Sequence, residues 1–200
     1  MSKFIDLASK RRSHYVVGKN VDYTVEEIAD YIGKVALEVP TAFNSQTSRL
    51  VIVTGEANAK VWNIIHQTQK EVLPAEMYEY FKGLFEGSEN NAFGTILFFE
   101  DREAIKANIP TNEERQEIYK EQNAANTQYA TWLALTELDL GATLQHFNVG
   151  YKQGFDRSLR EALNLPESWE LNAQMPFGSI EAEANPKDKM PVDEKVLVIK

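Results

Sequence analysis

The spacing of apolar residues along the chain predicts helices that outnumber strands. Behind Thr24, apolar side chains recur at helical spacing as far as Ala36, the pattern of a helix with one buried face. The sequence Thr24-Val25-Glu26-Glu27 is a capping box and predicts the start of this helix, and Pro40 marks its end. The runs 50–54 and 95–99 are short and rich in β-branched or aromatic residues. They predict strands, the second of them buried on both faces.

The other patterns complete an α+β fold in one domain, residues 1–200, without repeats or long flexible linkers. A short helix over 2–12 is expected to turn Phe4 and Ile5 inward. The longest helical pattern runs from about 113 to 140, with Gly141 where a C-capping glycine belongs. Helices are also predicted after Gly55, over 74–85 and over 155–163, and strands over 169–180 and 196–199. The last strand needs a partner, and a second subunit is one candidate.

Composition narrows the classes of function. Hydrophobic residues make up 43% of the chain, enough for a packed core. A formal net charge of −9 argues against nucleic acid and anionic membrane surfaces as partners. The absence of cysteine excludes disulfides, thiolate zinc sites, iron–sulfur clusters and cysteine nucleophiles. Residues 1–10 lack the apolar core of a secretory signal, and no segment is long enough to span a bilayer, so the cytoplasm is the expected location.

Common catalytic motifs are missing from the sequence. It contains no dinucleotide-binding glycine fingerprint, no P-loop and no nucleophile elbow. The three histidines form no helical His-x-x-x-His pair, so no metal site is expected. His66 is interpreted as a solvated residue on the polar side of a helix. His146 is either a substrate-site residue or a buried core histidine, and both readings stay open.

Two short polar segments suggest a phosphate site and a site for a hydrogen-bonding heterocycle. Arg11-Arg12-Ser13-His14-Tyr15 places two guanidinium groups beside a hydroxyl, and Arg offers a fork of donors that suits phosphate. The two arginines can share one phosphate only if the helix ends there, because neighbours on a helix point about 100° apart. In Phe43-Asn44-Ser45-Gln46-Thr47, Asn44 and Gln46 would point the same way on an extended segment.

Each of these segments also has an ordinary interpretation, as a solvated helix end or a polar turn. Their order along the chain, together with Lys187-Asp188-Lys189, resembles the nitroreductase family of FMN-dependent enzymes. Arg11 and Ser13 match the Arg-x-Ser motif of that family, and residues 40–46 match its Pro-Ser-Ser-x-Asn-x-Gln segment at Pro40, Asn44 and Gln46. Leu140-Gly141 matches the Leu-Gly that ends its central helix, and residues 145–150 match the segment that packs beside the flavin.

The resemblance implies roles for particular residues. The implied phosphate ligands are Arg11, Arg12, Lys187 and Lys189. The implied contacts to the ring edge are Ser13, Asn44 and Gln46, and the implied source of an N–H group near flavin N5 is Asn148, Val149 or Gly150. Tyr15 stands where many members carry Lys or Arg to stabilise the reduced ring. Arg49, or protonated His14, could supply that charge instead.

The resemblance also implies a fold and a reaction. The expected architecture is a mostly antiparallel sheet flanked by helices, in an intertwined homodimer that exchanges C-terminal strands. The expected activity is electron transfer from NADH or NADPH through FMN to nitroaromatic, quinone or related acceptors by a ping-pong scheme. A flavin-binding sensor or storage protein with little turnover is the alternative, and a plain interaction domain without cofactor is a third possibility. The sequence specifies neither the physiological acceptor nor the preferred nicotinamide nucleotide.

Overall fold

A computed structural model describes residues 2–148 and 155–200 of the chain. Its strands form an antiparallel sheet in the order β1-β5-β3-β2, with the short β4 also pairing to β5. The strands are β1 (Val17–Gly18), β2 (Ser48–Thr54), β3 (Gly94–Asp101), β4 (Gly141–Ala142) and β5 (Trp169–Ile180). The α+β class and the antiparallel sheet flanked by helices are therefore confirmed.

Strand β3 is the centre of the sheet. It pairs with β2 on one side, where Ile52 faces Ile96, and with β5 on the other, where Met175 faces Ile96. Ile96 and Phe98 join the hydrophobic core on one face of the sheet, whereas Leu97 and Phe99 join the core on the opposite face. This alternation explains why the run 95–99 is apolar throughout, and the predicted burial on both faces is confirmed.

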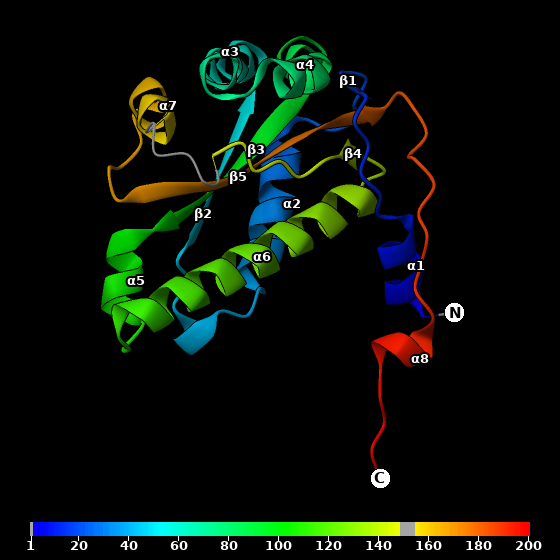
Figure 1. Ribbon diagram of the computed structural model, residues 1–200, viewed down its shortest axis with the longest axis vertical. Coiled ribbons are helices and arrows are strands. Elements are labelled where there is room, and N and C mark those ends of the chain that lie inside the picture. The colour runs from blue at the N-terminus through cyan, green and yellow to red at the C-terminus, as the bar shows by residue number, and fades with distance from the viewer. Residues whose placement is uncertain (1, 149–154) are drawn as a thin grey trace.

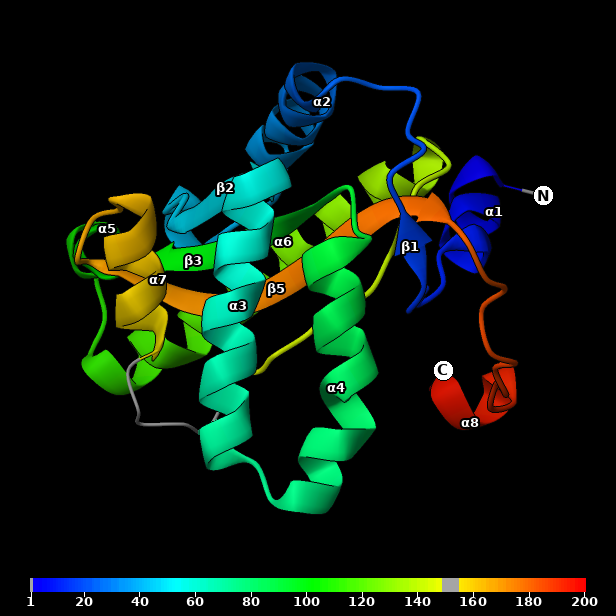
Figure 2. The ribbon, with the colours of Figure 1, turned by 90° about the horizontal axis from the view of Figure 1, so that it is seen from above.

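Helices cover both faces of this sheet (Figures 1 and 2). One face carries α3 (Gly55–Val72), α4 (Ala75–Asn90) and α7 (Phe155–Leu163), and the other carries α2 (Val25–Leu37) and the long α6 (Glu113–Glu137). The other helices are α1 (Lys3–Lys10), α5 (Arg102–Asn108), α8 (Val192–Lys195) and the single 3₁₀ turn η1 (Ala42–Asn44). The capping box of α2 is formed as predicted, with the Glu27 amide donating to Thr24 Oγ1 over 3.2 Å.

Two glycines allow the N-terminal segment to lie directly against β5. An ideal Cβ on Gly178 would sit 2.0 Å from the carbonyl oxygen of Gly18, which no side chain tolerates. A Cβ on Gly141 would lie 2.9 Å from Ile180 Cγ1. The prediction that Gly141 caps the long helix is wrong. Asp139, with φ of 61°, takes the left-handed position after α6, and Gly141 pairs with Gly178 in β4.

Two further predictions fail because tertiary contacts override the local pattern. Phe4 and Ile5 are 61% and 51% exposed, because α1 lies at the periphery of the molecule, against the end of α6 (Figure 1). His66 is mostly buried, because α4 folds back over α3 and its Tyr78 hydroxyl lies 2.8 Å from His66 Nε2. Residues 196–199 form no strand within the single chain, where Ile199 is 87% exposed, and their pairing with a second subunit stays a prediction.

None of the helices in the described ranges combines the length and the apolar character that a bilayer crossing requires. The same ranges hold no gathering of histidine and carboxylate side chains of the kind that binds a metal ion.

Candidate functional site

Arg11 stands directly after α1, where the helix ends as the phosphate hypothesis requires. Its amide closes the helix by donating to the Leu7 carbonyl over 3.0 Å. Its guanidinium lies over the Trp132 ring of α6, 4.3 Å from the ring centroid. Burial lowers the pKa of Arg11, an effect that nearby Tyr129 opposes and Arg12 reinforces. Within the described ranges no carboxylate pairs with this guanidinium, so Arg11 is a half-buried cation without an anion.

The segment after β5 runs beside this arginine. Arg12 donates from Nη2 to the carbonyl oxygen of Asn185, and His14 Nδ1 lies 3.3 Å from the carbonyl oxygen of Ala182. The backbone of the N-terminal segment is fixed as well, because the His14 amide donates to the Ala142 carbonyl over 3.0 Å. Figure 1 shows the chain from β5 towards α8 passing along α1. Lys187 is exposed to solvent and lies only two residues after Asn185, which contacts Arg12 directly.

Lys189 and Tyr15 are the other predicted residues of these two segments. Both are exposed to solvent, Tyr15 by 54%. Ser13 is half-buried and forms an isolated parallel bridge with Ala142, the last residue of β4. The structure thus brings most of the predicted phosphate ligands, from the two ends of the chain, to the same edge of the molecule.

The segment with Asn44 and Gln46 is not extended, which corrects the geometry expected from the sequence. Phe43, Asn44 and Gln46 have φ of 58°, 52° and 48°, so this part of the chain is a tight turn in left-handed conformations. Both amide side chains are exposed. They reach solvent because the intervening Ser45 turns inward, where it is 1% exposed.

Arg49 has a partner within its own chain. Its Nη2 lies 3.0 Å from Asp101 Oδ2, and its Nη1 donates to the carbonyl oxygen of Gln46 over 2.7 Å. Its charge is therefore largely neutralised, and Arg49 supports the backbone of the turn. Arg49 and His14 were the two groups considered as sources of the positive charge that Tyr15 does not supply. Of these two, His14 has the side chain with fewer hydrogen bonds.

Residues 145–148 are held by buried amide side chains that carry no recognisable signal in the sequence. Gln145 and Gln174 exchange backbone hydrogen bonds of 2.7 and 2.9 Å. The Gln174 side chain accepts from the Phe147 amide and donates to Asn148 Oδ1, over 3.2 and 2.8 Å. Gln69 of α3 donates to the Phe147 carbonyl over 3.0 Å. Val149 and Gly150, two of the three residues proposed to face N5, lie outside the described residues.

His146 lies in this segment and is exposed at the surface. The pKa of its imidazole is lowered, because neighbouring protein removes part of its hydration, while the charge of Glu121 partly offsets that effect. His146 is thus a surface group with a lowered pKa, not a buried core histidine.

The turn with Asn44 and Gln46 and the segment with Arg11 contact different parts of α6. Phe43 packs edge-on against Tyr119, with ring centroids 5.7 Å apart, whereas Arg11 lies over Trp132. The thirteen helical steps from Tyr119 to Trp132 correspond to about 20 Å. Within one chain the two candidate half-sites therefore lie well apart along α6.

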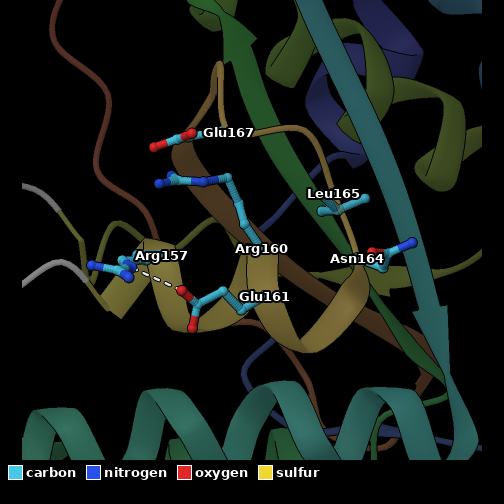
Figure 3. Close-up of a pocket in the computed structure, with 6 residues that line it drawn as sticks. All are labelled: Arg157, Arg160, Glu161, Asn164, Leu165 and Glu167. Carbon is cyan, nitrogen blue, oxygen red and sulfur yellow. Dashed lines mark hydrogen bonds and ion pairs between the residues drawn. The ribbon is translucent and has the colours of Figure 1, made fainter.

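A pocket lined by Arg157 and Arg160 lies at the end of α7 (Figure 3), and both arginines have carboxylate partners. Arg157 Nε lies 2.8 Å from Glu161 Oε1, and Arg160 Nη1 lies 2.7 Å from Asp156 Oδ2. Because each arginine already has a carboxylate partner, this pocket is a poorer anion site than the surroundings of Arg11.

The chain is similar to known proteins over most of its length. Residues 8–179 match the nitroreductase family. The protein HBN1 of Saccharomyces cerevisiae is 31% identical over 186 residues, which cover 90% of this chain and 89% of HBN1. Nitroreductase CinD from Lactococcus lactis, in complex with chloramphenicol, is 37% identical, with a TM-score of 0.84 over 99% of this chain and all of CinD. CinD in complex with 4-nitrophenol gives 36% identity and a TM-score of 0.83 over the same coverage. This chain belongs to the nitroreductase family.

Proposed function

We propose that this chain is an FMN-dependent oxidoreductase that takes electrons from NADH or NADPH and passes them to nitroaromatic, quinone or related acceptors in a ping-pong scheme. The observation that carries the proposal is the guanidinium of Arg11, which pairs with no carboxylate in the described part of the chain, with the Lys187 segment beside it. The family supports the reaction class, and CinD, one of the similar proteins of known structure, was solved in complex with the nitroaromatic 4-nitrophenol.

The residues present fit the phosphate of FMN. A half-buried cation without a counter-ion is unfavourable by itself, and a phosphate dianion is the ligand that relieves it. Arg11, stacked on the face of Trp132, would bind the phosphate through its guanidinium N–H groups, while Arg12, Lys187 and Lys189 would supply further donors from the adjoining segments. Lys187 and Lys189 are exposed, so they are free to move onto a bound anion.

The polar groups elsewhere fit the ring system. Asn44 and Gln46 present amides to solvent from a fixed turn, and amides offer both the donors and the acceptors that the flavin pyrimidine edge requires. Gln174 fixes the backbone as far as Asn148. When bound, FMN supplies the hydride and electron chemistry, and these protein groups bind and orient it. We therefore assign no general acid or base to the chain, and propose His146 as a substrate-site residue.

We further propose that the working protein is a homodimer in which each flavin lies between two chains. The half-sites at different parts of α6 support this, because a second copy would bring the Asn44 turn of one chain to the Arg11 segment of the other. The exposed apolar tail supports it as well. Leu197 and Ile199 are 81% and 87% exposed, and apolar side chains in such a row are normally covered by a partner. Exchange of this tail between subunits would also cover Phe4 and Ile5.

The first test is the visible absorption spectrum of the purified protein, before and after incubation with FMN. A yellow protein that oxidises NADH or NADPH only when a nitroaromatic or quinone is added would support the enzyme. A yellow protein that is bleached by NADH but reduces no acceptor would favour a sensor or storage role. A well-folded, colourless protein that takes up no FMN at micromolar concentration would contradict the proposal.

A further inference from the structure

The turn that carries Asn44 and Gln46 is strained and must be held by its surroundings. Phe43, Asn44 and Gln46 all have positive φ, which non-glycine residues rarely adopt. Three such residues within four positions persist only where neighbouring groups fix the backbone. The residues that supply this support decide where the side chains of Asn44 and Gln46 point.

Asn123, near the middle of α6, makes the most contacts to the turn. Its Oδ1 accepts from the Ala42 amide over 2.9 Å, at the start of the turn. Its Nδ2 donates to Ser45 Oγ and to Thr47 Oγ1, both over 3.1 Å, on the far side of Asn44. One side chain, 1% exposed, thus ties both ends of the strained segment to a rigid helix.

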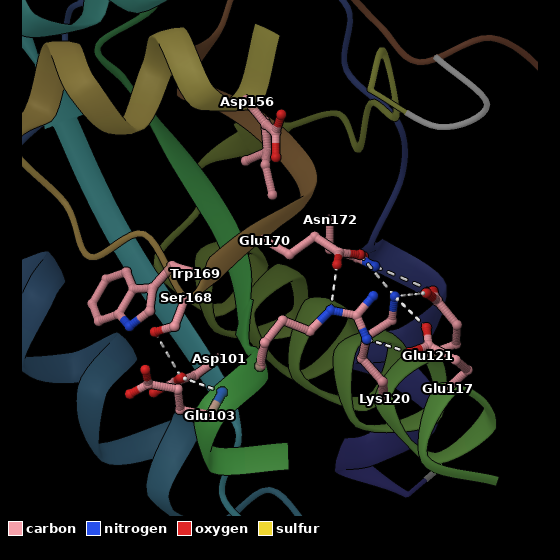
Figure 4. A network of polar contacts seen from close by, with 12 residues as sticks. Asp101, Glu103, Glu117, Lys120, Glu121, Asp156, Ser168, Trp169, Glu170 and Asn172 are labelled. Atoms are coloured by element: carbon pink, nitrogen blue, oxygen red, sulfur yellow. Dashed lines mark hydrogen bonds and ion pairs between the residues drawn. The ribbon is translucent and has the colours of Figure 1, made fainter. Parts of the chain in front are cut away.

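Contacts made by Thr47 and Lys120 restrict the movement of the Asn123 side chain. Thr47 Oγ1 donates onward to Glu100 Oε2 over 2.6 Å, so this hydroxyl accepts from Asn123 and gives to a buried carboxylate. One turn earlier on α6, Lys120 is 5% exposed and forms ion pairs with Glu117, Glu121 and Glu170, 2.8–3.1 Å away. Figure 4 shows this network joining α6 to β5. It fixes the part of the helix from which Asn123 projects.

A second, weaker support comes from α5. Asn108 Nδ2 donates to the Ser45 carbonyl oxygen over 3.1 Å, and the Asn108 residue is exposed at the surface. Removing this amide would therefore loosen the turn without leaving a cavity in the core.

We infer that Asn123 is a positioning residue for cofactor binding: through Ala42, Ser45 and Thr47 it holds Asn44 and Gln46 in the orientation that binds the edge of the flavin ring. The inference rests on the proposed function. Asn123 itself reaches no ligand, because it lies beneath the turn and is almost fully buried. Its loss should therefore weaken binding of the ring and leave binding of the phosphate unchanged.

The experiment compares FMN with riboflavin, which has the same ring and no phosphate. Both are titrated into the wild type, into Asn123→Ala and into Asn58→Ala, with binding followed by flavin fluorescence. Asn58 is the matched control. It is also a buried amide in a polar network, bonded to Ser88 and Thr95, but it does not contact the turn.

Asn123→Ala should weaken the binding of FMN and riboflavin by the same factor, about tenfold. The visible absorption maxima of the bound flavin should also move towards those of free flavin. Asn58→Ala should change both affinities by less than about twofold even if it unfolds at a lower temperature. Unchanged affinity and spectrum in Asn123→Ala, or equal losses in Asn58→Ala, would overturn the inference.

Two further measurements cover the cases in which Asn123→Ala does not fold or the wild type binds no flavin. If Asn123→Ala does not fold, Asn108→Ala replaces it, with an expected parallel loss of about threefold for both flavins; no loss would overturn the inference. If the wild type binds neither flavin, the proposed function fails, and with it the ligand assigned to this turn. Hydrogen exchange then decides separately whether Asn123 holds the turn. The Ala42 and Ser45 amides should exchange faster in Asn123→Ala than in Asn58→Ala.

Discussion

The guanidinium of Arg11 lies 4.3 Å from the centroid of the Trp132 ring, and these residues are far apart in the sequence. The ring face attracts the cation and also excludes water from one side of it. The same burial lowers the pKa of Arg11, which indicates a charge that would gain from an anionic ligand. This pair is therefore the most informative contact in the candidate phosphate site.

Removing the charge at this site should abolish retention of FMN. Two charge-assisted hydrogen bonds to phosphate contribute about 3–6 kcal/mol together, so Arg11→Ala/Lys187→Ala should lower FMN affinity by at least about a hundredfold and give a colourless preparation. Riboflavin affinity should change little, because riboflavin has no phosphate. Arg157→Ala/Lys60→Ala is the control with the same change in net charge at surface positions. Equal FMN affinity in the two double variants would show that Arg11 and Lys187 do not bind the phosphate.

The aromatic face of Trp132, and not its size alone, should contribute to FMN affinity. A cation–π contact contributes about 0.5–2 kcal/mol, so Trp132→Leu should weaken FMN binding roughly twofold to thirtyfold. Trp132→Phe keeps an aromatic face and should retain most of the affinity. Titration of both variants with FMN measures this, and similar losses in Leu and Phe would argue against a role for the aromatic face.

The close approach at Gly178 predicts a large loss of stability on adding one methyl group. In Gly178→Ala the new Cβ would collide with the Gly18 carbonyl, so β1 must leave β5, at a cost of more than about 3 kcal/mol. Gly33→Ala is the control. Nothing lies within 4 Å of its Cβ, on the exposed side of α2, and alanine should stabilise that helix by about 0.5–1 kcal/mol. Urea unfolding of both variants tests the pair of predictions; a Gly178→Ala protein as stable as Gly33→Ala would contradict the geometry.

Removing residues 192–200 should weaken both dimerisation and FMN retention. The segment includes Val196 and Leu197, which are 60% and 81% exposed and contribute no core contacts within their own chain. The truncated chain should therefore keep its fold, as judged by circular dichroism, while gel filtration shows a shift from dimer to monomer. An unchanged dimer after truncation would rule out exchange of this tail.

Glu100 should make stability depend on pH in an unusual direction. Burial raises the pKa of this carboxyl to about 6 from an ordinary 4.5, and hydrogen bonds from Ser48 and Thr47 and the charge of Lys120 only partly oppose that, while Glu121 adds to it. The folded state therefore binds the proton more tightly than the unfolded state. The stabilising contribution of Glu100 is fully present below about pH 4.5 and is lost as the pH rises through 6, by about 2 kcal/mol.

Glu100→Gln removes this titration while keeping the shape of the side chain. The free energy of unfolding of Glu100→Gln minus that of the wild type should be near zero at pH 4.5 and rise to about 2 kcal/mol at pH 7. Urea unfolding at a series of pH values measures it. A difference that does not change with pH would mean that Glu100 titrates normally.

The sequence determined the elements whose signals are local. Continuous apolar character marked β3, helical periodicity behind a capping box marked α2, and the long pattern from Glu113 marked α6, because these signals depend on backbone geometry and burial of the segment itself. The order of the polar segments was sufficient to identify the family, which the comparisons confirm. The short β1 and β4 and the helix α5 carried no such signal and were missed.

Tertiary structure alone decided how the candidate site is assembled. The left-handed turn at Asn44, the ring of Trp132 under Arg11, and the amides of Gln174 and Asn123 all depend on contacts between residues distant along the chain. A buried amide on a helix has the same local pattern whether its partner is a strained turn or a neighbouring helix. Periodicity records which face of a segment is buried, whereas the packing of one segment on another determines what that face touches.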